Sequence, residues 1–479
     1  MFDLSAVQAA VRDLGLDGWL LYDFRGLNVL ARRVIGLAPD QMLSRRWFYF
    51  VPANGAPRKL VHRIEPHALD GVPGEHDLYL RWQELESGVQ KLLAGSKRVA
   101  MEYVPRNANP YVSRVDAGTV ELVRSFGVEV VPSGDLIQLF EACWDDEQWA
   151  LHLEASKHTR SAYDVAFAFI AERVRSAGSV HELEVQQRIL DHFAQHNLIC
   201  DHPPIVGVGP HSGDPHYEPK PGPEGIIRAD DFVLIDLWAK MNKPRAVYSD
   251  LTWTCFVGDR VPDKYEKVFR IVAAARDAGI ARVRTAFAKG ETLQGWQVDR
   301  ATRDVIDKAG YGEAFCHRTG HSIGQETHGN GANMDNLETK EERRVLPRTC
   351  FSIEPGIYLP EFGVRSEVDV FVDKNRQVHV TGGDPQTAVV TILGRTRNFD
   401  PEVHSPKIES ASIPQHRERE SLLQNRELNE KKTIERALSN HGYNRSRAAS
   451  ALGISRVTLY KKMKKYELMP SQQSEDDEE

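Results

Sequence analysis

Residues 349–373 read TCFSIEPGIYLPEFGVRSEVDVFVD. Short apolar runs alternate here with Gly and Pro, which predicts β-strands separated by tight turns. Glu354 follows the first apolar run directly, and Glu367 opens the last one. An ionised carboxylate beside a buried strand loses its hydration, so it requires a compensating partner. The stretch therefore predicts a β-rich core that places acidic side chains at a specific site.

The same pattern occurs at three earlier points of the chain. The residues concerned are Asp236 in VLIDLWA, Asp250 in VYSDLTWTCF and His321 in HRTGHSIG. Any one such acid is more often a capped or salt-bridged residue than a ligand. Four carboxylates buried together, however, oppose ionisation through desolvation and like-charge repulsion. Two divalent cations would balance the four charges, so the set as a whole predicts a two-metal site.

The chemistry of the donors narrows the choice of metal. Oxygen donors with one imidazole and no thiolate favour manganese first, with cobalt or zinc as alternatives, and disfavour soft metals. Two such ions roughly 3.5 Å apart can share a water molecule, lower its pKa and present hydroxide to a carbonyl group. The predicted cofactor is therefore a pair of divalent cations.

The rest of the first 400 residues indicates alternating helices and strands. Residues 1–145 contain strand-like runs such as DGWLLYD and RRWFYFVP between segments of helical spacing, which is typical of an α/β domain. No group of polar residues in that stretch suggests chemistry. Residues 145–176 and 181–197 have apolar residues at three- and four-residue steps and predict two helices. The strand-like runs with the acids follow.

The end of the chain has a different composition. Residues 401–428 are polar and contain proline, which predicts a linker, and residues 471–479 form an acidic tail. Between them, residues 429–466 hold ten Lys or Arg against two Glu, a net +8 that leaves −15 for the rest of a chain of charge −7. A compact basic module on an acidic body predicts a polyanionic partner for the module alone. We expect a small helical domain over residues 429–470.

Bulk properties exclude several classes of protein. The chain has 479 residues, too many for a single core, and no run of eighteen apolar residues that could cross a membrane. The N-terminal sequence has no secretory-signal pattern. The five cysteines are scattered without a C-x-x-C pair, so a disulfide framework or thiolate metal site is not expected. We expect a cytoplasmic protein with reduced thiols.

The order D…D…H…E…E, within HRTGHSIG, SIEPGIY and GVRSE, resembles the metallopeptidase family of Xaa-Pro aminopeptidases, prolidases and methionine aminopeptidases. The resemblance implies a pita-bread catalytic domain over residues 146–400. Residues 1–145 resemble, by position and pattern, the extra domain of creatinases and prolidases. Methionine aminopeptidases lack this domain, so the resemblance favours cleavage next to proline. Creatinases share the fold without metals, yet here all ligand residues are present.

The resemblance also implies roles for individual residues. Asp250 and Glu367 would bridge both metals, Asp236 would complete one shell, and His321 and Glu354 would complete the other. The implied catalytic residues are His216, His328, Glu354 and Arg365, with His317 near the pocket. Glu354 would relay a proton to the leaving proline nitrogen, and the two histidines His216 and His328 would hydrogen-bond the scissile carbonyl or its oxyanion. His202 and His211 match nothing and are expected to be surface histidines.

Two departures from the family pattern bear on the site. Asp236 and Asp250 are fourteen positions apart, whereas the family usually spaces them by eleven. Three extra residues inside the strands would turn one aspartate to the opposite face, but an insertion confined to the hairpin turn would not. The chain also reads RSEVD where the family commonly reads R-I-E-D, so an acid that could orient a neighbouring ligand is displaced.

The basic segment NEKKTIERALSNHGYNRSRAASALGISRVTLYKKMKKYEL resembles the helix-turn-helix modules of the Fis family. Gly453 would supply the positive φ of the tight turn. By this resemblance, Arg456, Thr458, Tyr460 and Lys461 would face the major groove of double-stranded DNA. Other basic residues would contact phosphates, namely Arg445, Lys462, Lys464 and Lys465. Such modules act as dimers, so a homodimer is expected.

Together these observations predict an α+β protein with a creatinase-like α/β domain, a pita-bread metallopeptidase domain and a small all-α DNA-binding domain. The predicted activity is hydrolysis of peptides next to proline. The alternative is a transcription regulator whose peptidase-like domain senses a peptide or small ligand without turnover. A third reading makes the C-terminal module a fusion with no regulatory role.

Overall fold

The computed structural model describes residues 2–38, 40–394, 431, 434, 438, 445–451, 456–466 and 468. The chain divides into two compact units, Met1–Phe399 and Asp400–Glu479. The first mixes helices and strands, and the described part of the second is helical, which confirms the α+β prediction. The predicted linker at 401–428 and acidic tail at 471–479 lie outside the described residues.

The N-terminal part of the first unit is built on one six-stranded sheet in the order β4-β3-β2-β1-β5-β6. Its strands are β1 (Gly18–Asp23), β2 (Trp47–Pro52), β3 (Arg58–His62), β4 (Glu75–Tyr79), β5 (Arg98–Met101) and β6 (Glu129–Pro132). Strand β2 is antiparallel to both neighbours and the other pairs are parallel. The runs DGWLLYD and RRWFYFVP are thus confirmed as strands.

Helices cover both faces of this sheet. They are α1 (Leu4–Asp13), α2 (Val29–Val34), α3 (Trp82–Leu92), α4 (Ala117–Ser125) and α5 (Gly134–Glu141). Alternate residues of β1 serve two cores: Trp19 packs in the core that includes α1, α2 and α5, and Leu20 in the core that includes α3 and α4. A strand buried on both faces requires the continuous apolar run seen in the sequence.

The following part begins with α6 (Asp146–Ala177), which starts at a capping box of Asp145 with Gln148 and ends at Gly178 in the left-handed region (φ 79°). Helix α7 (Glu182–Gln195) follows. Both predicted helices are confirmed within one or two residues. They pack in one core with a hairpin of β11 (Phe232–Met241) and β12 (Ser249–Phe256).

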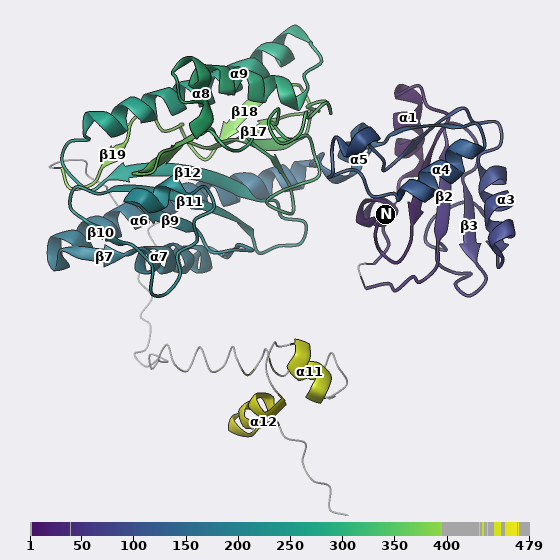
Figure 1. Ribbon diagram of the computed structural model, residues 1–479, viewed down its shortest axis with the longest axis horizontal. Helices are drawn as coiled ribbons and strands as arrows, with labels where there is room; N and C mark the ends of the chain where they lie inside the picture. The colour runs from purple at the N-terminus through teal and green to yellow at the C-terminus, as the bar shows by residue number, and fades with distance from the viewer. Residues whose placement is uncertain are drawn as a thin grey trace, which may run out of the picture. The chain divides into compact units, whose positions relative to one another are not determined.

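A second layered half completes this part (Figure 1). Helices α8 (Asp263–Lys289) and α9 (Gly295–Lys308) lie on one side of a sheet ordered β13-β14-β17-β18. Its strands are β13 (Ser322–Ile323), β14 (Cys350–Ile353), β17 (Val368–Val372) and β18 (Val378–Thr381), and β15 (Gly356–Tyr358) pairs with β16 (Gly363–Arg365) beside it. An isolated bridge between Thr252 and Glu367 connects the two halves.

Shorter elements complete the first unit. They are the 3-10 turns η1 (Pro105–Asn107), η2 (Gly209–Gly213) and η3 (Gly312–Ala314), and the strands β7 (Ser179–His181), β8 (Leu198–Ile199), β9 (Ile205–Val208), β10 (Ile226–Arg228) and β19 (Val390–Thr391). No helix in the described part of the chain is long and apolar enough to span a bilayer. The five cysteines are free thiols.

The described part of the second unit contains α11 (Arg445–Ala451) and α12 (Arg456–Lys465). Ala448 and Ala449 of α11 pack against Leu459 and Met463 of α12 in a small core. Small residues at the contact let two helices approach closely. Gly453 and the predicted turn lie outside the described residues.

Candidate active site

The β11–β12 hairpin places Asp236 and Asp250 on the same face of a sheet. In the register, Asp236 lies opposite Thr252 and Asp250 lies opposite Trp238. Directly paired residues share a face, and so do residues two apart on one strand, so both carboxylates point to the same side. The last pair before the turn joins Ala239 and Ser249. The three extra residues therefore lengthen the turn and preserve the facing of the two acids.

The second half of the fold contributes the remaining predicted ligands. His321 immediately precedes β13, Glu354 immediately follows β14, and Glu367 immediately precedes β17. Each of these residues lies directly outside a strand end. Its polar side chain can therefore point away from the apolar core without interrupting the backbone hydrogen bonds of the sheet. Glu367 also meets Thr252 at the bridge between the halves. Side chains more than a hundred positions apart in sequence thus come together.

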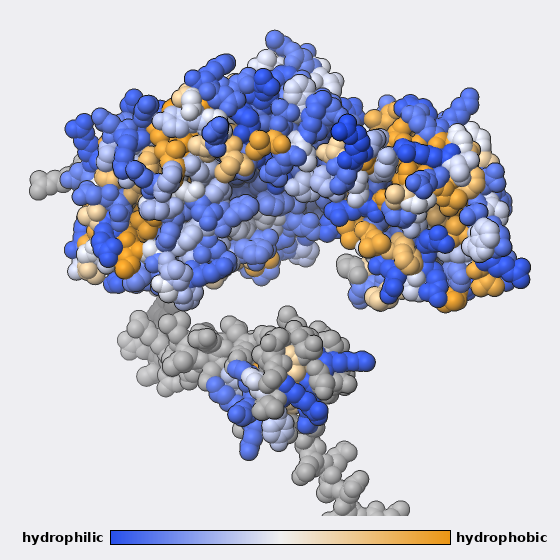
Figure 2. All heavy atoms as spheres, in the orientation of Figure 1, coloured by the Kyte–Doolittle hydropathy of each residue, from blue (hydrophilic) through white to orange (hydrophobic). Residues whose placement is uncertain are grey.

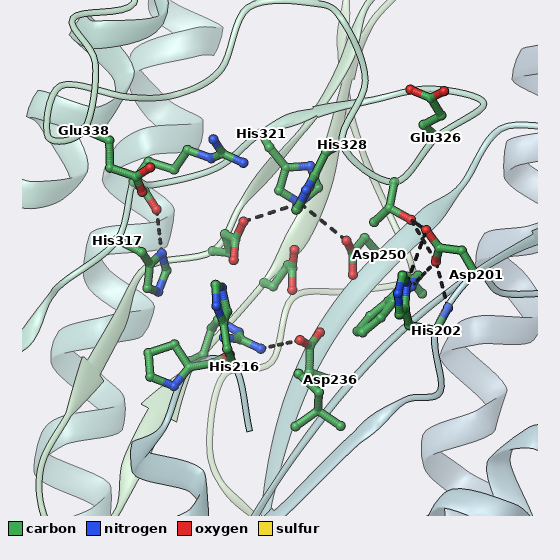
Figure 3. A pocket seen from close by; sticks show the side chains of 18 of the residues that line it. Asp201, His202, His216, Asp236, Asp250, His317, His321, Glu326, His328 and Glu338 are labelled. Carbon is green, nitrogen blue, oxygen red and sulfur yellow. Dashed lines mark hydrogen bonds and ion pairs between the residues drawn. The ribbon is translucent and has the colours of Figure 1, made fainter. Parts of the chain in front are cut away.

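A cavity of about 650 Å³ collects these side chains (Figure 3). All eight residues predicted as metal ligands or catalytic groups line it, namely His216, Asp236, Asp250, His321, His328, Glu354, Arg365 and Glu367. His317 lines it as well. Within the described residues, the structure therefore brings the complete predicted set into one place.

Three of the predicted ligands form the tightest group. One donor atom each from Asp250, His321 and Glu367 lie within 4.8 Å of one another. His321 Nε2 is also 3.5 Å from a carboxylate oxygen of Asp250 and 3.5 Å from one of Glu354. The donor set contains carboxylate oxygens and one imidazole, and none of the described residues lining the cavity is a cysteine. This chemistry fits hard divalent cations.

Asp236 has a different environment. Its carboxylate forms an ion pair with the Arg365 guanidinium, and both side chains are buried. The Thr252 hydroxyl lies 3.0 Å from Asp236 Oδ1 and 2.7 Å from Glu367 Oε2, and it accepts a hydrogen bond from Arg365 Nε at 3.0 Å. The sequence did not single out Thr252, because a threonine in a strand is an ordinary β residue. It joins ligands from both halves.

Burial dominates the electrostatics of the site. Desolvation raises the pKa of Asp236, and it raises the pKa of Asp250 and of Glu367 well above their usual values, with further upward contributions from neighbouring carboxylates. Burial acts in the same direction on Glu354, but His321, His317 and Arg365 outweigh it and lower its pKa. Carboxyls that resist ionisation in this way need additional positive charge beside them to be charged at neutral pH.

Three histidines of the cavity, His317, His321 and His328, are held as neutral rings. Burial lowers the pKa of His321 to about 3 and the pKa values of His317 and His328 to about 4. The His328 ring packs edge-on against His321 with centroids 4.3 Å apart. His317 Nε2 lies 2.8 Å from the Tyr358 hydroxyl, which also lies 3.1 Å from Arg365 Nη1. A neutral imidazole can coordinate a cation or donate one hydrogen bond.

Asp369 holds the backbone of Asp250 in place through a hydrogen bond. Its carboxylate accepts the backbone N–H of Asp250 at 3.0 Å, and burial raises its pKa to about 8. In the segment RSEVD, which differs from the usual R-I-E-D of the family, the acid therefore lies two residues after Glu367 and not one. From there it binds the strand that carries Asp250. The Asp369 carboxylate also approaches His152 Nε2 at 3.9 Å.

The rim of the cavity includes residues that the sequence did not indicate. Asp201 accepts the indole N–H of Trp238 at 2.7 Å and lines the cavity with His202. His202 is an exposed histidine, as expected, but it lies at the rim. His211, also expected at the surface, is half-buried, and its ring lies 3.0 Å from the buried Glu182 carboxylate. These residues carry no motif signal that could have identified them.

The predicted DNA-contacting residues lie on α12 of the second unit, except Arg445, which begins α11. Arg456, Tyr460 and Lys461 of α12 are exposed, as are Lys464 and Lys465, while Thr458 and Lys462 are half-buried. Leu459 and Met463 face the core. The basic side chains thus lie on the helix surface that the core does not use.

Comparison with known proteins finds a family match in each of the two compact units. Residues 150–374 match the family model described as metallopeptidase family M24, and residues 426–466 match that of bacterial regulatory protein, Fis family. Probable dipeptidase PepE of Mycobacterium tuberculosis is 33% identical over 189 residues, 39% of this chain and 46% of its own length. A Mycoplasma genitalium relative is 32% identical over 185 residues, 38% of this chain and 48% of its own length. The chain spans about half the length of these two relatives.

Two solved structures share the fold of the first unit. Dipeptidase PepE from Mycobacterium ulcerans superposes with a TM-score of 0.57 at 23% identity, over 81% of this chain and 96% of that chain. Xaa-Pro dipeptidase from Bacillus anthracis superposes with a TM-score of 0.52 at 22% identity, over 81% of this chain and 98% of that chain. The predicted pita-bread fold is confirmed.

Proposed function

We propose that this chain hydrolyses peptide bonds next to proline with two bound divalent cations, and that it also binds double-stranded DNA. The match of residues 150–374 to metallopeptidase family M24 supports the first activity, and the match of residues 426–466 to the Fis family supports the second. The observation that carries the enzymatic part is the meeting in a single cavity of one imidazole, three buried carboxylates and the half-buried carboxylate of Glu354. Burial of this set is unfavourable without added cations.

The charge of the site supports two cations. The four carboxylates carry −4 when ionised, and Arg365, which the sequence-based charge balance did not include, supplies +1. One divalent cation would leave −1 and two would give +1. A small positive excess suits a site that must stabilise the negative charge developing on a carbonyl oxygen. We propose manganese as the first choice, with cobalt or zinc as alternatives.

The ligand roles follow the family resemblance, by which Asp250 and Glu367 would hold both cations. Their closeness supports this proposal, since donor atoms of Asp250, His321 and Glu367 lie within 4.8 Å of one another. His321 and Glu354 would complete one shell and Asp236 the other. When bound, the cations supply Lewis-acid activation of a water molecule. Arg365 and Thr252 hold Asp236 in position, so its carboxylate keeps one fixed orientation.

The chain's own groups handle the proton and the carbonyl. Glu354, whose pKa is lowered by its neighbours His321, His317 and Arg365, is ionised and can accept a proton from the attacking water. It then passes this proton to the leaving nitrogen, which in an Xaa-Pro bond is a tertiary amide and must be protonated as it departs. His216 and His328 donate hydrogen bonds to the scissile carbonyl oxygen.

The DNA-binding part rests on α12. Arg456, Thr458, Tyr460 and Lys461 would read bases in the major groove, and the more C-terminal lysines Lys462, Lys464 and Lys465 would contact phosphates. We propose a cytoplasmic homodimer, because modules of this kind act in pairs. Light scattering on the full-length protein tests the oligomeric state.

A second candidate function is favoured by the fusion itself. A peptidase-like domain joined to a DNA-binding domain could sense a proline-containing peptide and change DNA affinity without turnover. This function predicts ligand-dependent DNA binding and negligible hydrolysis. The enzymatic function predicts turnover whether or not DNA is present.

The decisive experiment combines metal analysis with a panel of Xaa-Pro dipeptides and longer peptides on the full-length protein. We expect about two equivalents of Mn²⁺ or Co²⁺ and cleavage only before proline. Asp250→Asn should remove both metal and activity. Full activity in that variant, or no hydrolysis of any panel member by the loaded protein, would contradict the proposal.

A further inference from the structure

A second large cavity lies in the N-terminal α/β part, where the sequence suggested no chemistry. Its volume is about 1020 Å³. It opens at the edge of the sheet where β1, β3 and β4 end and β2 begins, and Tyr22, His62 and Tyr79 form its wall there. In open α/β sheets, ligands commonly bind in the crevice outside the carboxyl ends of the strands.

Three arginines line this cavity. They are Arg25, in the loop after β1, and Arg45 and Arg46, directly before β2. Among the described residues, no carboxylate lies within 4 Å of any of the three guanidinium groups. By contrast, Arg33 and Arg98 of the same part form ion pairs. Unpaired arginines gathered around one cavity favour binding of an anion.

The loop that carries Arg25 is held in a fixed shape. Asp23, fully buried at the end of β1, accepts the backbone N–H of Gly26 at 3.0 Å and of Asn28 at 2.8 Å. Arg25 itself adopts a left-handed conformation with φ 57°. A non-glycine residue in this region is strained, and such strain persists only where surrounding contacts enforce it. These contacts hold the backbone of Arg25 in one conformation at the edge of the cavity.

The loop that carries Arg45 is anchored in the same manner. The Glu65 carboxylate accepts the backbone N–H and hydroxyl of Ser44 at 2.7 and 2.6 Å, and the backbone N–H of Arg45 at 3.2 Å. Glu65 therefore satisfies these loop donors and forms no ion pair with the Arg45 guanidinium, whose Nη1 donates to the Ser44 carbonyl and hydroxyl oxygens at 3.4 and 3.1 Å. Of the two acids that line the cavity, Asp116 is occupied in capping α4 through Thr119, and Glu86 is the other.

The cavity also has an apolar side. Trp82 is 63% exposed, and Leu80 and Phe24 are exposed as well. Apolar side chains reach the surface at several places on the N-terminal part (orange spheres in Figure 2). Exposed large apolar residues grouped beside cations favour a ligand that combines a planar apolar ring with negative charge.

We propose that this cavity binds a mononucleotide-like ligand, with its ring against Trp82 and its phosphate on Arg25, Arg45 and Arg46. The site is distinct from the metal-binding cavity. Helix α2 follows the Arg25 loop directly, and its Arg33 pairs at 2.5 Å with Glu326 at the rim of that cavity. A ligand here would therefore bind one helix away from the candidate active site, in the position of an effector.

Calorimetric titration of the full-length protein with AMP, ATP, adenosine and inorganic pyrophosphate tests this site. We expect saturable binding of a nucleotide and binding at least about tenfold weaker for adenosine, which lacks the charge. Arg45→Ala/Arg46→Ala should weaken nucleotide binding by about tenfold or more, and Trp82→Ala should weaken nucleotide but not pyrophosphate. Arg114→Ala, an exposed arginine of the same part outside the cavity, is the matched control.

The outcomes separate this site from other anion sites. All substitutions remove exposed or half-exposed side chains, and unchanged circular dichroism and melting temperature verify folding. Nucleotide binding that survives Arg45→Ala/Arg46→Ala but disappears in Asp250→Asn would place the anion on the metal centre and overturn the inference. Absence of saturable binding for every nucleotide up to millimolar concentration would overturn it as well.

Discussion

Asp250→Asn is expected to stabilise the metal-free protein while abolishing its response to metal. Asp250 is 4% exposed, and its carboxylate approaches that of Glu367 within the 4.8 Å group, with no guanidinium or ammonium partner among the described residues. Two unit charges at 4.8 Å repel by about 3 kcal/mol at an effective dielectric constant of about 20. The isosteric amide removes this repulsion and part of the desolvation penalty.

The size of the effect depends on pH. The pKa of Asp250 is raised in the folded state, so the wild-type carboxyl is protonated at low pH and contributes full stability below its unfolded value of 3.8. This stability is lost as pH rises through the folded pKa. We therefore expect Asp250→Asn to gain about 1–3 kcal/mol in free energy of unfolding at pH 8, with a smaller gain at pH 5.

Urea unfolding with and without Mn²⁺ provides the assay. The wild type should gain about 2.7 kcal/mol at a metal concentration a hundred times its Kd, and the variant should gain almost nothing. Asp299→Asn is the matched control: Asp299 is equally buried but pairs with Arg303 at 3.1 Å and accepts the Thr319 N–H at 2.9 Å. That control should lose about 3–5 kcal/mol. Destabilisation of metal-free Asp250→Asn comparable to that of the control would refute the reasoning.

Four further predictions follow from the same geometry. Glu354→Gln should lower kcat for an Xaa-Pro substrate by about 10²-fold or more, and steady-state kinetics at saturating metal measure this. Thr252→Val should weaken metal binding by about tenfold in competition with a chelator, because ligands from both halves lose the shared hydroxyl. Burial lowers the pKa of His152 to about 4, so this histidine should subtract roughly 3 kcal/mol from the unfolding free energy as pH falls from 6.5 to 4, and His152→Gln should lessen the acid dependence of stability by that amount. Lys461→Ala/Lys464→Ala should reduce duplex affinity and the slope of its salt dependence, and an unchanged slope would argue against phosphate or base contacts at these positions.

The site ligands could be predicted because they conflict with their local sequence. A carboxylate such as Asp236 inside VLIDLWA violates the apolar pattern of a buried strand, and the violation is visible without a structure. The sequence alone does not determine whether Asp236 and Asp250 point to the same face of the sheet, because this depends on whether the three extra residues lie in the strands or in the turn. The structure places them in the turn.

Other features could not be predicted, because their residues fit their surroundings. Thr252 and Tyr358 are ordinary residues of strands, and their roles arise only when strands from two halves meet. The pair of Arg365 with Asp236 joins positions 129 apart in the chain. Helices α8 and α9 were not predicted from the sequence, although Asp263–Lys289 buries an apolar face.

The N-terminal part contributes to the active site through its rim, without supplying a predicted ligand. Loop residues Glu326 and Asn330 flank His328, and they pair with Arg33 at 2.5 Å and with Glu141 at 2.9 Å. Glu326 and Arg33 are largely exposed, and an exposed ion pair stabilises by about 0–1 kcal/mol, so this contact holds the loop only weakly. A weak restraint of that size can be shifted by a ligand that binds the N-terminal part and displaces α2 slightly. We infer that the position of His328, and with it the hydrogen bond proposed for a substrate carbonyl, can be altered from the N-terminal part through this loop.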